Sequence, residues 1–215
     1  MLFALAATTA QAQAPAPKPA APPAAATATA TATAADYVIT GFRGARFGMT
    51  QAQVRAAAAA DFPGAVLSDT ANPLEGTQAL QAIVPKLEPG PGAATVIYIF
   101  GASSKTLAHI NVVWSVAGEP TTDQRASIVT AAVQLTNYFQ GLPTPPKATA
   151  GVTPTGPNGL LMYAAVDKKG GGIEIAADGI SYQTSGPDAA ASAPPKGPAV
   201  LRVSYLANVL NPDVL

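Results

Sequence analysis

One stretch of the chain combines a helix-capping pattern with a run of small apolar residues, and it predicts a helix. Thr50 is a favoured N-cap residue, and Gln53 three positions later completes a capping box. Met49 and Val54 occupy the two positions of a hydrophobic staple. The Ala-rich sequence that follows favours a helix to about Ala60.

A second stretch repeats this pattern and predicts a second helix from about Thr121. Gln124 again stands three residues after the cap. Apolar side chains then recur at helical spacing and form one stripe, which consists of Ile128, Ala132, Leu135, Phe139 and Leu142. Gly141 and the prolines after it end the helix.

Short runs rich in β-branched and aromatic residues predict strands between and after the helices. They cover residues 80–84, 95–100, 107–116, 160–166, 173–177, 180–184 and 199–206. Pro85 predicts that the first run is an edge strand, because proline has no backbone N–H to donate to a neighbouring strand. The run 95–100 is apolar on both faces, so we expect it to lie inside the sheet.

The run 107–116 alternates between two faces. Ile110, Val112 and Trp114 share one face, which we expect to be the core, while His109 and Asn111 lie on the other. Glycine-containing turns separate the strands at residues 101–105, 168–172 and 178–179, whereas 148–159 and 185–198 are expected to be a linker and a surface loop.

The order helix, strands, helix, strands predicts an α+β fold in which each capped helix precedes an antiparallel meander. We expect two degenerate tandem copies of one unit, residues 36–118 and 119–215, packed as one globular body. The two halves share no long identical stretch.

The N-terminus has a different character. Residues 1–14 contain an apolar run followed by Ala-x-Ala patterns, which is typical of the end of an export signal, with cleavage after Ala12 preferred. Residues 15–35 are rich in Ala, Pro and Thr and predict a disordered tether. No Lys or Arg precedes the apolar run, so either the true start lies upstream or the signal is weak. The alternative is an Ala-rich N-terminus on a cytoplasmic protein.

Composition narrows the classes of function. The chain has no Cys, so disulfides, thiolate metal sites and a thiol nucleophile are excluded. The net charge is zero and only 11% of residues are charged, which gives no electrostatic footprint for nucleic acid. We expect no transmembrane segment in the mature chain, because the apolar runs are shorter than the roughly 20 residues that a spanning helix needs.

The segment Gly48-Met49-Thr50-Gln51-Ala52-Gln53-Val54 resembles the helix start of small bacterial envelope proteins of the SmpA/OmlA (BamE-like) group. The tandem layout is similar to that of the β-lactamase-inhibitor-protein fold. This resemblance implies a helix packed on an antiparallel sheet, an envelope location and a binding or scaffolding role. The BamE-like proteins are anchored through a Cys that this chain lacks, and no functional residue is carried over.

Four basic side chains are candidates for binding. Arg46 and Arg55 bracket the start of the first helix, whose free N–H groups favour anions, and Arg43 lies close by in sequence. A partner carboxylate or phosphate could dock there; alternatively, Arg43 and Arg46 pair with local carboxylates or lie in solvent. His109 is the only histidine, and an ordinary strand residue is its default role.

No catalytic or metal-binding pattern is recognisable. Ser103-Ser104-Lys105 lies in an expected hairpin turn, without the spacing of a Ser–Lys nucleophile. Asp61, Asp69 and Glu75 match no calcium-loop spacing. We therefore expect a non-enzymatic binding or scaffold module of the bacterial envelope, periplasmic or secreted, with another envelope protein as partner and no cofactor. The alternatives are a secreted protein inhibitor, or an exported enzyme whose site the sequence does not reveal.

Overall fold

The computed structural model describes residues 36–72, 76–183 and 194–213. The chain divides into two units, and all of these residues belong to the second, Ala34–Leu215. The expected export signal and tether, residues 1–35, lie outside the described residues, as does most of the expected loop 185–198.

Both predicted helices are confirmed. Helix α1 spans Gln51–Asp61 and helix α2 spans Thr122–Gln140. Each begins with the predicted capping box, in which the N-cap threonine accepts from the backbone N–H of the glutamine three residues later. The glutamine side chain in turn accepts from the backbone N–H of Thr50 or Thr121, at 2.9 Å in each case. The caps therefore fix both helix starts from local sequence alone.

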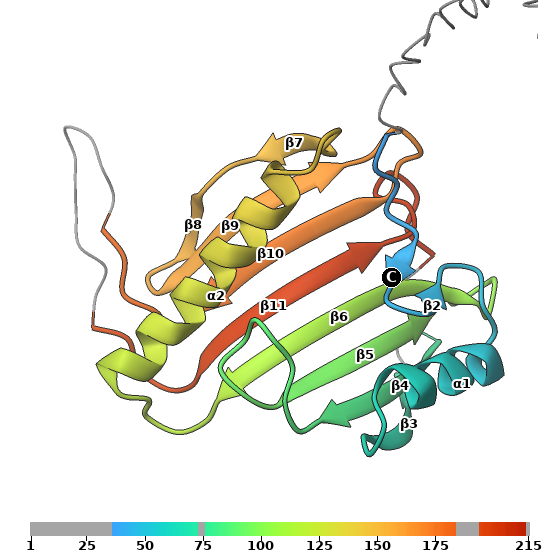
Figure 1. The fold of residues 1–215 in the computed structure, drawn as a ribbon, viewed down its shortest axis with the longest axis horizontal. Coiled ribbons are helices and arrows are strands. Elements are labelled where there is room, and N and C mark those ends of the chain that lie inside the picture. The colour runs from blue at the N-terminus through green and yellow to red at the C-terminus, as the bar shows by residue number, and fades with distance from the viewer. Residues whose placement is uncertain (1–35, 73–75, 184–193, 214–215) are drawn as a thin grey trace, which may run out of the picture. The chain divides into compact units, whose positions relative to one another are not determined.

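Nine described strands form one antiparallel sheet, in the order β3-β4-β5-β6-β11-β10-β9-β7, with β8 also paired to β9 (Figure 1). Their bounds are β3 Val66–Asn72, β4 Thr77–Val84, β5 Ala94–Phe100, β6 Leu107–Val116, β7 Lys147–Ala150, β8 Thr153–Gly156, β9 Gly159–Val166, β10 Gly172–Asp178 and β11 Ala199–Leu206. The predicted α+β class is confirmed.

The topology repeats along the chain. Helix α1 is followed by the meander β3 to β6, and helix α2 by β7 to β11. The last strands of the two meanders, β6 and β11, pair at the middle of the sheet, with Val112 opposite Val203. That the two halves are degenerate tandem copies of one unit stays a prediction.

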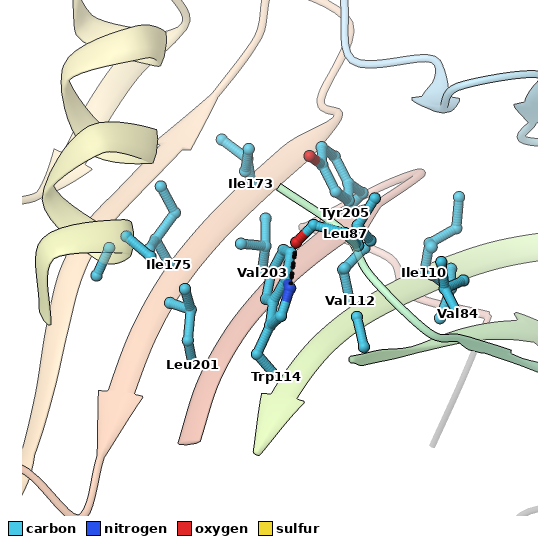
Figure 2. Packing of buried hydrophobic residues seen from close by; sticks show 14 of the residues in the cluster. Val84, Leu87, Ile110, Val112, Trp114, Ile173, Ile175, Leu201, Val203 and Tyr205 are labelled. Atoms are coloured by element: carbon cyan, nitrogen blue, oxygen red, sulfur yellow. Dashed lines mark hydrogen bonds between the residues drawn. The ribbon is translucent and has the colours of Figure 1, made fainter. Parts of the chain in front are cut away.

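Both helices lie on the same side of the sheet (Figure 1), where α1 contacts β4 and α2 contacts β9, β10 and β11. The core lies between them and this face. The side chain of Trp114, predicted to face the core, is 3% exposed. Its indole Nε1 donates to the carbonyl of Leu87 at 2.7 Å, so the β4–β5 loop folds over the sheet beside it (Figure 2).

An N-terminal arm, residues 36–49, crosses the same face. It contains a two-stranded ribbon of β1 Gly41–Phe42 and β2 Ala45–Arg46, which the sequence did not predict. The backbone N–H of Ile39 donates to the buried carboxylate of Asp167 at 2.6 Å, which anchors the arm to the end of β9.

The opposite side of the sheet, here called the open face, is covered by no described helix. It carries a mixture of polar side chains, among them His109, Asn111, Arg202 and Glu174, and β-branched apolar side chains, among them Ile83, Ile97, Ile99 and Val113. None of the described strand residues on this face is aromatic. The alternation predicted for 107–116 is thus confirmed, with Ile110, Val112 and Trp114 on the core side.

Three predictions about the sheet are wrong. Strand β4 begins at Thr77 and lies inside the sheet, because the unpredicted strand β3 forms the edge beyond it. Strand β3 has a weak pattern, with Val66 62% exposed. The expected linker 148–159 contains β8 and most of β7, both largely exposed edge strands, a position where Pro154 is tolerated.

The third error concerns 180–184, which forms no strand among its described residues. Ile180 is instead held in a turn by Asn158. The backbone N–H of Ile180 donates to the Asn158 carbonyl at 3.1 Å, and Asn158 Nδ2 donates back to the Ile180 carbonyl at 3.2 Å. Gly179 precedes it with φ of 64°, a conformation that ends β10.

Candidate functional site

A cavity of about 480 Å³ lies on the helix side of the sheet, between α2, the N-terminal arm and the β4–β5 loop. We call it the aromatic groove. The described residues that line it are Tyr37, Gly41, Phe42, Arg43, Pro89, Gln134, Leu135, Tyr138, Phe139 and Tyr205. Its volume falls in the range of small-ligand sites, and five of these ten residues are aromatic.

The five rings hold one another in place. Phe42 stacks on Tyr205, with ring centroids 5.5 Å apart, and Phe139 meets Tyr205 edge-on at 6.4 Å. Tyr37 and Tyr138 each contact Phe139 edge-on, at 6.2 and 5.0 Å. Such pairs add stability beyond area burial and restrict the rings, so the groove is preformed.

Helix α2 supplies one wall because of its periodicity. Gln134, Leu135 and Tyr138 are spaced three and four residues apart and therefore share a face. Phe139 belongs to the apolar stripe predicted from the sequence and is 2% exposed, whereas Tyr138 is 59% exposed. The wall thus runs from a buried floor at Phe139 to an open rim at Tyr138.

Tyr205, from β11, lies with its ring in the floor of the groove. The residue is only 7% exposed, and no residue in the described part of the chain forms a hydrogen bond with its Oη. Burial raises the pKa of Tyr205 well above its ordinary value, with smaller contributions from Tyr37 and Tyr138. The phenol is therefore neutral and free to donate or accept a hydrogen bond in the groove.

Arg43 places a positive charge at one end of the groove. It sits in the turn between β1 and β2 with φ of 51°, a left-handed conformation. Its guanidinium lies over the ring of Phe62, 4.7 Å from the centroid, and its Nη1 is 3.4 Å from the carbonyl oxygen of Asp61. It forms no ion pair with any carboxylate that the structure describes.

Arg46 and Arg55, the other two candidate arginines, do not line the groove. Arg46 Nη1 donates to the backbone carbonyls of Arg43 and Ala45. Arg55 pairs with Asp69 on β3, which also accepts from Gln51 at 2.8 Å. Arg55 thus has a local carboxylate partner and Arg46 has backbone carbonyl partners, and of the three arginines only Arg43 lines the groove.

His109 lies on the open face, away from the groove. It borders a cavity of about 60 Å³ near the C-terminal segment, and its buried Nε2 has no hydrogen-bond partner among the described residues. Burial lowers the pKa of His109, Asn111 raises it by hydrogen bonding, and Arg202 lowers it. The imidazole is consequently neutral near pH 7.

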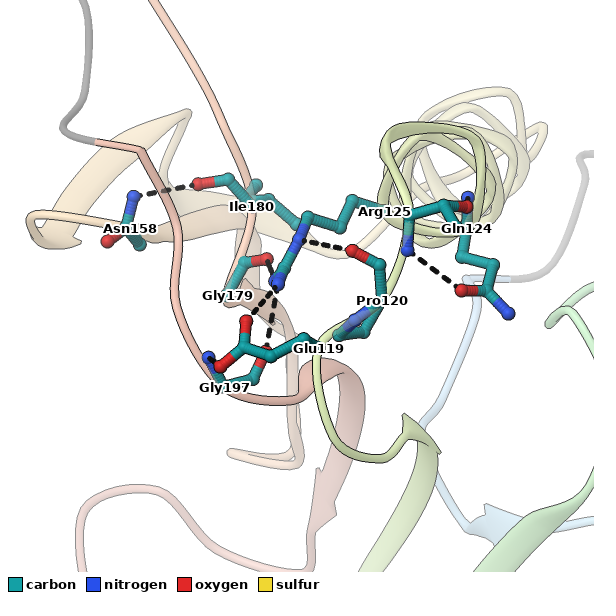
Figure 3. Close-up of polar contacts among 9 residues, drawn as sticks. Glu119, Pro120, Gln124, Arg125, Asn158, Gly179, Ile180 and Gly197 are labelled. Atoms are coloured by element: carbon teal, nitrogen blue, oxygen red, sulfur yellow. Dashed lines mark hydrogen bonds and ion pairs between the residues drawn. The ribbon is translucent and has the colours of Figure 1, made fainter.

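Arg125 is a further notable charge, which the sequence did not single out. It is buried at the start of α2, where its guanidinium donates to the carbonyls of Pro120, Gly179 and Gly197 and pairs with Glu119 (Figure 3). A cavity of about 560 Å³ adjoins it. All of its described contacts are internal, so Arg125 joins α2 to the ends of β10 and β11. Arg125 stands three residues before Ile128, in line with the apolar stripe of the helix, and this spacing indicates that its side chain is buried.

The remaining candidate chemistry does not converge. Lys105 Nζ donates to the carbonyl of Gly76, while Ser103 and Ser104 donate backbone N–H groups to Asp213. Asp61 accepts from the backbone N–H of Gly44 at 2.7 Å. In residues 36–72, 76–183 and 194–213, no group of three His, Asp or Glu side chains could hold a metal ion. Glu75 lies outside the described residues.

None of the helices described in the structure combines the length and the apolar character that crossing a membrane requires. We take the groove as the candidate site because five aromatic rings and Arg43 meet along its described lining. No protein-family model, curated protein or solved structure matches this sequence.

Proposed function

We propose that this chain is an exported binding module of a bacterial envelope, and that its partner binds in the aromatic groove. The observation that carries this proposal is the preformed row of aromatic rings, which ends at the exposed Tyr138 and at Arg43, a charge with no ion-pair partner among the described residues. Exposed aromatic and arginine side chains around a cavity are the typical anchors of binding sites.

The export part of the proposal rests on sequence. The apolar run, the Ala-x-Ala patterns and the Ala/Pro/Thr-rich segment 15–35 stand in the order of a signal and a tether. Fractionation of cells expressing the full gene tests it, together with the intact mass of the purified chain. Recovery of an uncleaved chain from the cytoplasm would refute export and leave the groove proposal standing.

The open face is the competing surface, and it would be the one used by an inhibitor of the expected tandem layout. Trp114 points to the core, so this face offers no aromatic anchor in its described strands. Its most exposed large apolar side chains are Val66 and Ile83, paired neighbours on β3 and β4. We therefore place the partner in the groove.

Site-specific photocrosslinking in the native envelope separates the two surfaces. A benzoylphenylalanine at position 138 reports on the groove, one at position 83 on the open face, and one at position 133 on the exposed outer side of α2. We expect one crosslinked protein from position 138 alone, identified by mass spectrometry. Capture from position 83 alone, or no product from position 138, would overturn the assignment.

A further inference from the structure

We infer that the aromatic groove binds an extended, proline-rich segment of a partner protein in the polyproline II conformation, with an acidic residue placed beside Arg43. The inference rests on the proposed function, in that it takes the groove as the binding site, and it adds the chemical class of the ligand. Three properties of the groove support it: its rings, its hydrogen-bonding groups and its charge.

The rings present a ridged apolar surface. Tyr37 and Phe42 are half-buried on one side of the groove and Tyr138 is exposed on the other, while Phe139 and Tyr205 form the floor. Proline rings pack flat against aromatic rings, and polyproline II loses little entropy on binding because it is already extended. One turn of this helix has three residues and spans about 9 Å, a length suited to a cavity of about 480 Å³.

The hydrogen-bonding groups of the groove favour a ligand rich in acceptors. Tyr205 Oη has no described partner, and Tyr37 and Tyr138 are close enough to it to influence its pKa. Gln134 and Arg43 add side-chain N–H donors to the lining. A polyproline II segment has no internal hydrogen bonds and its prolines lack N–H groups, so it presents carbonyl acceptors that need donors of this kind.

The charge of the groove selects among proline-rich sequences. Arg43 is the only charged side chain in the described lining, which contains no carboxylate. Its stacking on Phe62 holds the guanidinium in place. A Glu or Asp next to the prolines would form an ion pair there, whereas a Lys would be repelled.

Isothermal titration of the full chain with short peptides tests the inference. The probes are acetyl-Pro-Pro-Ala-Pro-Pro-Glu-amide, the same peptide with Lys in place of Glu, and acetyl-Ala-Ala-Gly-Ala-Ala-Glu-amide. We expect the first to bind at least tenfold more tightly than the proline-free peptide, and several-fold more tightly than the Lys peptide. Equal affinity for the proline-free peptide would overturn the inference.

Variants assign the binding to named groups. Tyr138→Ala should weaken binding at least tenfold, whereas Val133→Ala, on the same helix but outside the groove, should leave it unchanged. Tyr205→Phe keeps the ring and removes only the hydroxyl, so we expect a loss of about fivefold. Arg43→Gln should abolish the preference for Glu over Lys.

The outcome is distinguishable from failure of the proposed function. If no proline peptide binds while position 138 still crosslinks to an envelope protein, the groove is a binding site and the ligand class is wrong. If position 138 captures nothing and no proline peptide binds, both proposals fail. If the peptides bind but Tyr138→Ala and Tyr205→Phe have no effect, the binding lies elsewhere and the inference is refuted.

Discussion

Replacing Arg125 by Ala should cost about 3 kcal/mol of unfolding free energy, and most of this loss should come from its hydrogen bonds to backbone carbonyls rather than from its ion pair. The guanidinium donates to Pro120 O at 3.2 Å, Gly179 O at 2.5 Å and Gly197 O at 3.0 Å. Its carboxylate partner Glu119 is 3.3 Å away, with a side chain that is 71% exposed. The two kinds of contact therefore differ in their exposure to water.

The magnitude follows from this difference. A hydrogen bond with one charged partner contributes roughly 1.5 kcal/mol at the lower limit, so the three carbonyl bonds of Arg125 contribute about 4.5 kcal/mol. Truncation to Ala returns about 1.5 kcal/mol of side-chain entropy, which leaves about 3 kcal/mol. An exposed ion pair contributes less than about 1 kcal/mol, and this small amount is all that Glu119→Gln should lose.

Urea unfolding followed by the fluorescence of Trp114 measures both variants, because this single tryptophan is buried in the core. Arg125→Ala should also lower Tm by roughly 6–12 °C, since a domain of this size loses about 2–4 °C per kcal/mol. Arg125→Lys keeps the charge without the guanidinium fork, so its loss of stability should lie between those of Glu119→Gln and Arg125→Ala. If Glu119→Gln costs as much as Arg125→Ala, the ion pair dominates and the reasoning is wrong.

Further predictions concern the core, a helix cap and two titrating groups. Trp114→Phe removes the hydrogen bond to the β4–β5 loop and part of a buried ring, so it should cost at least about 1 kcal/mol in thermal unfolding followed by circular dichroism; an unchanged stability would contradict this expectation. Thr121→Ala removes the N-cap of α2 and should cost about 1 kcal/mol, whereas the exposed Thr130 should be replaceable by Ala at much lower cost. Burial lowers the pKa of His109, so on acidification the imidazole takes up a proton in the unfolded chain before it does so in the folded one. Stability should therefore fall as pH decreases through about 6.5. His109→Gln should remove this pH dependence of stability, and a variant with the same dependence as the original chain would contradict the prediction. Hydrogen bonds from Ser104 and Ser103 lower the pKa of Asp213 to about 2, so the C-terminal segment should stay attached above about pH 4, and Asp213→Asn should speed amide exchange at Ser103 and Ser104.

Sequence predicted those parts of the fold that are encoded locally. Both helices begin where a threonine and a glutamine three residues later satisfy the free N–H groups, and this requires no tertiary contact. Strand β6 was predicted with its full bounds because its alternation is clear. Strands β3, β7 and β8 were missed, since edge strands need only backbone pairing with a neighbour and carry little apolar pattern.

The sequence predicts little of the candidate site. Arg43 was selected for its proximity to a helix start, but the structure shows it beside aromatic rings from distant parts of the chain. Tyr37, Tyr138 and Tyr205 come from the arm, α2 and β11, and only the folded sheet brings them together. The pattern of a single segment does not predict contacts between side chains from three distant segments. The burial of Phe139, in contrast, follows from its place in the apolar stripe of one helix.

The pairing of β6 with β11 has a consequence for biosynthesis. During translation, β6 emerges about 90 residues before β11, as the register of Val112 with Val203 implies. Until then β6 is a free edge that carries Ile110, Val112 and Trp114, which are the side chains that later form the core. The nascent chain is therefore most prone to aggregation in this interval, until β11 has been synthesised and pairs with β6.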